Sequence, residues 1–85
     1  MTLTENQKKT VSDLIIANIG DLNEVEEFNF TLKCSECTNE EIDILDQLCA
    51  DPSAKHALSD FLWVSVRYSV IRDEYEISGS VSKGM

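Results

Sequence analysis

Residues 51–77 read DPSAKHALSDFLWVSVRYSVIRDEYEI and contain the longest apolar pattern in the chain. Six of them recur at alternating steps of four and three, the spacing of one face of an α-helix: Ala57, Phe61, Val64, Tyr68, Ile71 and Tyr75. Asp51 can cap the first turn, and Pro52 suits the first helical position, where no amide hydrogen is needed. The stretch therefore predicts one long central helix.

The same stretch also contains a strand pattern. Residues 64–71 alternate between apolar and polar side chains, and β-branched and aromatic residues are enriched in strands. Such a strand would pair with residues 28–34 or fold back on residues 75–81. We prefer the helix because residues 72–74 lack the Gly or Asn that a tight two-residue hairpin turn requires.

Two further helices are predicted from their start signals. Capping-box patterns at residues 4–7 and 38–41 each precede apolar residues at helical spacing. Gly20 then supplies a residue suited to ending the first helix. The sequence therefore predicts helices over about residues 5–19 and 39–50.

The segment between these two helices is ambiguous. Residues 22–28 match a short helix, whereas residues 28–34 alternate as a strand would. With the long helix preferred, the sequence predicts an all-α bundle of three to four helices, with residues 1–78 as one domain and residues 79–85 as a flexible tail. The alternative is an α+β fold with a small antiparallel sheet built from residues 28–34 and 64–71.

The net charge of −9 is concentrated in one third of the chain. Residues 21–51 contain ten acids and one base, Lys33, whereas the segments on either side are balanced. Clustered negative charge repels nucleic-acid phosphates and anionic membranes and attracts basic proteins. We therefore expect a basic protein partner, with no direct nucleic-acid contact and no membrane contact. The candidate contact residues are acids of this segment and the single tryptophan: Glu24, Glu26, Glu27, Glu40, Asp43, Asp46 and Trp63.

Three cysteines and one histidine form the clearest metal-binding pattern. Cys34, Cys37, Cys49 and His56 read C-x2-C-x11-C-x6-H, and zinc binds thiolate sulfur and imidazole nitrogen. The spacing matches no common zinc finger, so we expect no cofactor and keep a zinc-stabilised regulatory domain as an alternative. Reduced thiols and the absence of an apolar leader in residues 1–20 favour the cytoplasm.

No catalytic constellation is evident in the sequence. His56, Ser59 and Asp60 would share one exposed helical turn, where three side chains cannot form a buried proton relay. There is also no Gly-rich phosphate-binding loop. We therefore expect a protein that is not an enzyme.

In size, acidity and expected helical pattern, the chain resembles a class of small inhibitors. That class includes colicin-nuclease immunity proteins, antitoxins and phage-encoded antagonists of host enzymes, although the Tyr-Tyr-Pro motif of the helical immunity proteins is missing here. The resemblance implies an inhibitor or antagonist that occupies a basic surface of a protein partner, such as a surface that binds nucleic acid. A third hypothesis is a homodimeric structural accessory protein that buries the broad apolar helix between subunits.

Overall fold

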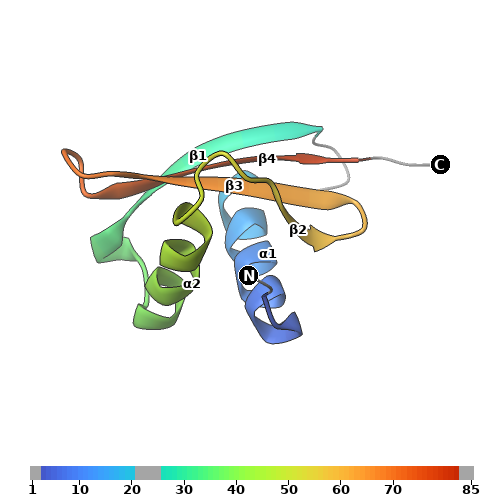
Figure 1. Ribbon diagram of the computed structural model, residues 1–85, viewed down its shortest axis with the longest axis horizontal. Helices are drawn as coiled ribbons and strands as arrows, with labels where there is room; N and C mark the ends of the chain where they lie inside the picture. The colour runs from blue at the N-terminus through green and yellow to red at the C-terminus, as the bar shows by residue number, and fades with distance from the viewer. Residues whose placement is uncertain (1–2, 21–25, 83–85) are drawn as a thin grey trace.

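The computed structural model describes residues 3–20 and 26–82 and shows an α+β fold. Over these residues, four antiparallel strands form one sheet, in the order β1 (Glu27–Lys33), β4 (Glu74–Val81), β3 (Leu62–Ser69) and β2 (His56–Ser59). Two α-helices lie side by side against one face of the sheet (Figure 1). The predicted all-α helical bundle is therefore wrong, and the α+β alternative gives the correct class. The pairing expected in that alternative, residues 28–34 with residues 64–71, is wrong, because the strand of residues 74–81 lies between them.

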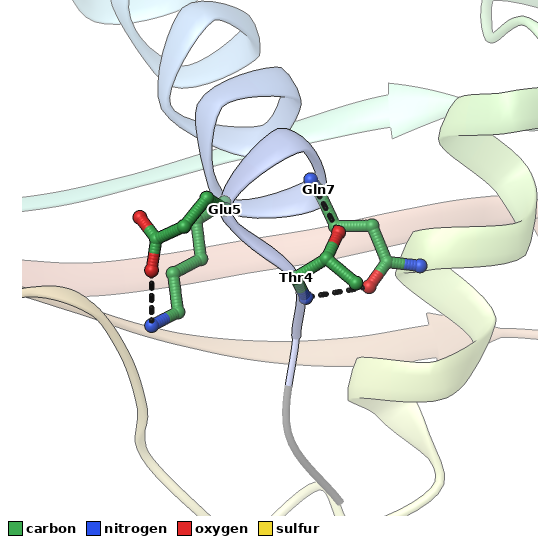
Figure 2. Close-up of polar contacts among 4 residues, drawn as sticks. Thr4, Glu5 and Gln7 are labelled. Atoms are coloured by element: carbon green, nitrogen blue, oxygen red, sulfur yellow. Dashed lines mark hydrogen bonds and ion pairs between the residues drawn. The ribbon is translucent and has the colours of Figure 1, made fainter.

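Helix α1 (Glu5–Ile19) forms where its capping box predicted it. The Thr4 hydroxyl accepts the amide of Gln7 at 3.1 Å, and the Gln7 side chain accepts the amide of Thr4 at 2.9 Å (Figure 2). Two amides of the first turn, which have no partner inside the helix, are thereby satisfied. Gly20 follows with a φ of 88°, which side chains disfavour, and its amide donates to the carbonyl of Ile16. The prediction for residues 5–19 is confirmed.

Helix α2 (Asn39–Cys49) is fixed by the second capping box. The Thr38 hydroxyl accepts the amide of Glu41 at 3.1 Å, and the Glu41 carboxylate accepts the amide of Thr38 at 2.7 Å. The side of the helix that faces the sheet is apolar and buries Ile44, Leu45 and Leu48. The helix predicted over residues 39–50 is also confirmed.

The ambiguous segment between the helices contains a strand, β1 (Glu27–Lys33). It pairs along its whole length with β4, because its alternating side chains match the two faces of a sheet. A short 3-10 turn, η2 (Cys34–Glu36), then leads to α2. The helix predicted over residues 22–28 is therefore wrong at residues 27–28, which belong to the strand. Residues 22–25 of that prediction lie outside the described residues.

The long helix predicted over residues 51–77 is wrong. The stretch instead forms β2 (His56–Ser59), β3 (Leu62–Ser69) and half of β4 (Glu74–Val81). The alternation of side chains prevails over the helical spacing because β3 lies between β2 and β4, where every second side chain is buried under the helices.

β3 and β4 form the hairpin that the sequence argument rejected. Its turn contains no Gly or Asn, and Asp73 itself takes the left-handed conformation, with a φ of 53°. Two tertiary contacts hold it: the Tyr68 hydroxyl donates to the Asp73 carboxylate at 2.5 Å, and the Cys34 amide donates to the Asp73 carbonyl at 3.1 Å. Because Ser69 pairs with Glu74, residues 70–73 form a four-residue loop, and the requirement for Gly or Asn in a two-residue turn does not apply to it.

The two faces of the sheet differ in chemistry. The face under the helices carries the core, to which the strands contribute Phe28, Leu32, Leu58, Leu62, Val64, Val66, Tyr75, Ile77 and Val81. Over the described residues, no helix or strand covers the opposite face, here called the open face (Figure 1). Its side chains are mostly polar: Glu27, Asn29, Thr31, Trp63, Ser65, Arg67, Glu76, Ser78 and Ser80.

The end of β4 shows how closely the strands pack. The ring of Phe28 lies over Gly79, and a Cβ atom on Gly79 would come within 2.6 Å of its Cζ atom. The strand continues to Val81, which is only 7% exposed, so the ordered domain includes the first residues of the segment assigned to a tail. Residues 83–85 lie outside the described residues.

Candidate partner-binding surfaces

The outer side of α2 carries three of the acids predicted to bind a partner. Glu40, Asp43 and Asp46 are exposed there, because the buried apolar side fixes the rotation of the helix. Glu36 is exposed just before the helix, in η2. Acids near the amino end of a helix also stabilise its dipole, which accounts for part of their placement.

Within the described residues, no base forms an ion pair with these carboxylates. The ion pairs found there are Lys8–Glu5 at 3.5 Å, Lys9–Asp13 at 2.9 Å and Arg72–Glu74 at 3.8 Å. Two of them lie on α1, where Figure 2 shows the pair made by Glu5, and the third lies beside the β3–β4 hairpin. The outer side of α2 therefore keeps its negative charge and attracts cations.

The other predicted acids are not brought to α2. Glu26 and Glu27 are exposed at the start of β1, whereas η2 and α2 follow the far end of that strand. Glu27 lies on the open face, beside Ser80 of β4. Glu24 lies outside the described residues. The acidic segment of the sequence is therefore divided between two parts of the surface.

A cluster of tyrosines and carboxylates joins α2 to the hairpin. Tyr75 is 2% exposed and donates its hydroxyl to Asp46 at 2.5 Å, while the ring of Tyr68, which is bonded to Asp73, lies 5.3 Å away. Burial and the bond to Asp46 raise the pKa of Tyr75, and the bond to Asp73 raises the pKa of Tyr68 to about 12. Both phenols are neutral donors near pH 7, so each can donate to its carboxylate, and the bond from Tyr75 to Asp46 connects β4 to α2.

The three cysteines are free thiols, and each is partly buried. Burial raises the pKa of Cys34, and the Asp73 carboxylate raises it further. Burial is also the largest cause of the raised pKa values of Cys37 and Cys49. Since the thiolate is the nucleophile, thiols that stay protonated are poor candidates for redox or covalent chemistry.

Three of the four candidate zinc ligands make separate polar contacts. Cys37, Cys49 and His56 each lie against a backbone carbonyl, at 3.5, 3.4 and 3.1 Å. Because a carbonyl only accepts, the Nε2 atom of His56 carries the proton in that contact. Among the described residues, no group of three or more Cys, His, Asp or Glu side chains is arranged to hold a metal ion.

The tip of the β3–β4 hairpin exposes two aliphatic side chains. Val70 is 79% exposed and Ile71 is 98% exposed. The hairpin projects beyond the helices in the half of the molecule that contains η2 and α2 (Figure 1). Neighbouring aliphatic residues in full contact with water, on a turn held by the Asp73 contacts, are typical of a surface that binds a partner.

Trp63 lies half-buried in a hollow of the open face. The strand register places it beside Ser80, and Ser80 beside Glu27, so two predicted contact residues lie on the same face with one strand between them. The hollow has a volume of about 750 Å³, and its lining includes Glu27, Asn29, Trp63, Ser65, Ser78 and Ser80. This site is on the opposite side of the sheet from α2.

Comparison with protein families, curated proteins and solved structures finds no match for the chain. Of the helices in the described residues, none combines the length and the apolar character needed to cross a bilayer. The function therefore has to follow from three surfaces: the outer side of α2, the hairpin tip and the hollow around Trp63.

Proposed function

We propose that the chain is a non-enzymatic binding module that docks on a basic surface of a protein partner through the outer side of α2. One observation carries this proposal: Glu40, Asp43 and Asp46 project from a fixed helix and have no ion-pair partner among the described residues. Lysines and arginines of a partner would supply the counter-charges. Such an interface forms rapidly and is sensitive to salt, because opposite charges steer the encounter.

The acids of α2 are held in place before any partner binds. The Thr38–Glu41 capping box fixes the start of the helix, and the bond from Tyr75 to Asp46 fixes its middle. Leu45 is 0% exposed and anchors the helix in the core. A rigid surface loses less conformational entropy on binding, so more of the attraction contributes to affinity.

The hairpin tip supplies the apolar part of the proposed interface. Val70 and Ile71 belong to the hairpin tip, which lies in the same half of the molecule as α2 (Figure 1). Protein interfaces commonly combine an apolar centre with a polar rim. The partner feature that matches both surfaces is an apolar pocket bordered by lysine and arginine side chains.

A protein that covers such a surface acts as an inhibitor or antagonist. Basic grooves on proteins commonly bind nucleic acid, and an acidic module seated there would compete with the phosphates. The three free thiols favour a reducing compartment, so we place this activity in the cytoplasm. The homodimer hypothesis needed a broad apolar helix over residues 51–77, and that stretch forms strands whose apolar side is buried within the domain.

Two charge-matched double variants test the proposal. E40K/D43K reverses two unpaired acids on α2, whereas E5K/D13K reverses two acids of α1 that are ion-paired with lysines. Both variants change the net charge by the same amount, so any difference between them depends on position. Asp46 is left unchanged because it accepts the hydroxyl of Tyr75.

The partner is captured from cells that make the protein, identified by mass spectrometry and purified for measurement of its dissociation constant. We expect E40K/D43K to weaken binding at least about tenfold, or about 1.4 kcal/mol, and E5K/D13K to weaken it less than about threefold. Both variants should keep the native circular dichroism spectrum. Equal losses in the two variants, or a native affinity that is the same at about 50 mM and about 500 mM salt, would refute the proposal.

A further inference from the structure

The open face is sunken around Trp63, on the side of the sheet that the proposed function does not use. The residues that surround the indole on β3 and β4 have short side chains: Ser65, Ser78 and Ser80. Long side chains return at the next position outward, where Arg67 lies beside Glu76. The result is a hollow of about 750 Å³ with a flat aromatic ring beside it, within the range of about 300–1,000 Å³ that is usual for ligand sites.

The stability of the strands does not require this composition. Asn is disfavoured in strands, yet Asn29 of β1 lines the hollow. The Ser65 hydroxyl donates to the carbonyl of Ala54 at 3.0 Å, which holds the segment before β2 at the side of the hollow. Trp63 places a large aromatic ring on the solvent side of the sheet, a position common for tryptophans that contact ligands or partners.

The polar groups of the hollow are suited to an uncharged ligand with many hydroxyl groups. Serine hydroxyls and the Asn29 amide both donate and accept hydrogen bonds, as the hydroxyl groups of a ligand do. One acid, Glu27, and one base, Lys55, also line the hollow, so it has no excess of either charge. The rest of the lining is apolar and comes from Ile19, Phe28 and Val64. An anionic ligand would also be repelled by the net charge of −9.

We propose that the hollow is a saccharide-binding site. One face of a sugar ring, where carbon-bound hydrogens point outward, lies on the indole of Trp63. The hydroxyl groups at the rim of the ring bond to Asn29, Ser78 and Ser80. Because the hollow and α2 are on opposite sides of the sheet, a saccharide and a protein partner can bind at the same time.

The single tryptophan of the chain makes this proposal directly measurable, since fluorescence reports on Trp63 alone. The probes are three uncharged oligosaccharides, namely cellotetraose, maltotetraose and chitotetraose, each titrated into the native protein up to about 10 mM. We expect a saturable change in emission with at least one probe, with half-saturation below about 1 mM, or a binding free energy beyond about −4 kcal/mol. The absence of a saturable change with all three probes would overturn the proposal.

Two variants that retain Trp63 locate the binding. S78A/S80A removes two hydroxyls from the hollow, and Thr31→Ala removes one from the same open face, outside the hollow. We expect S78A/S80A to weaken binding at least about tenfold and Thr31→Ala to change it less than about twofold. Equal affinity in the native protein and S78A/S80A would overturn the assignment. If the protein partner changes Trp63 emission and none of the saccharides does, the hollow belongs to that partner, and the saccharide proposal is overturned.

Discussion

Replacing Gly79 by alanine is expected to destabilise the domain, although strand propensity alone predicts the opposite. Alanine is more stable than glycine in the middle of a strand by about 0.5–1 kcal/mol. Gly79 lies in β4, between β1 and β3, and a Cβ atom there would clash with the backbone oxygen of Trp63 and lie 2.6 Å from Cζ of Phe28. The sign of the change depends on whether these neighbours can move.

Neither neighbour moves easily. The Trp63 oxygen belongs to β3, which is paired with β4 on both sides of this position, and Phe28 is 8% exposed in the core. Overpacking a core costs about 1–3 kcal/mol, and the backbone clash at Gly79 favours the upper half of that range. After the gain in propensity is subtracted, the expected net loss is about 2 kcal/mol, from a total of about 4–13 kcal/mol for a domain of 85 residues.

Urea unfolding measures this change, followed by Trp63 fluorescence and far-ultraviolet circular dichroism. The midpoint for Gly79→Ala should fall while the slope stays constant, as expected for a loss of stability without a change in the unfolded state. Ser78→Ala is the matched control, because Ser78 is exposed on the open face, and it should change the stability by less than about 0.5 kcal/mol. A Gly79→Ala protein at least as stable as the native protein would refute the close approach of β3 and β4.

Three other predictions concern the hairpin and its contacts. Tyr75→Phe removes the bond to Asp46 and should lower the free energy of unfolding in urea by about 1–2 kcal/mol; unchanged stability would show that this bond does not hold α2. V70S/I71S should change stability by less than about 0.5 kcal/mol, because both residues are exposed, and should weaken the partner complex; a large loss of stability would contradict the exposed tip. Stability should also fall as pH rises from about 9 to about 12, because the two tyrosines and three cysteines have higher pKa values in the folded state than in the unfolded state. Their contribution to the free energy of unfolding is fully present below the pKa values of the unfolded state. It is lost as pH rises through the pKa values of the folded state. Unfolding free energies measured across that range that stay constant or rise would contradict this assignment.

The helices could be predicted from the sequence because their signals are local. A capping box joins residues three positions apart, and those at Thr4 and Thr38 form as expected. Residues 64–71 satisfied both a helical and a strand spacing, and the choice between them depends on pairing with β4 across a turn. That turn requires Asp73 in the left-handed conformation, held by Tyr68 and by the amide of Cys34, which is far away in the sequence.

For the candidate surfaces too, the sequence predicted the features that depend on local patterns and missed those that depend on the order of the strands. The exposure of Glu40 and Asp43 follows from the apolar spacing of their own helix. The placement of Trp63 and Glu27 on the same face, on either side of Ser80, depends on the order of three strands, which local patterns do not determine. The bond from Tyr75 to Asp46 joins residues 29 positions apart and has no local signal.

Nuclear magnetic resonance of the labelled chain tests most directly whether the partner binds α2. Amide chemical shifts are recorded before and after the captured partner is added to saturation. Our account predicts that the largest changes fall within residues 36–47 and at the hairpin tip, residues 70–71, while Asn29, Ser65 and Ser78 of the open face stay nearly unchanged. Largest changes on the open face or on α1, with α2 unchanged, would contradict it.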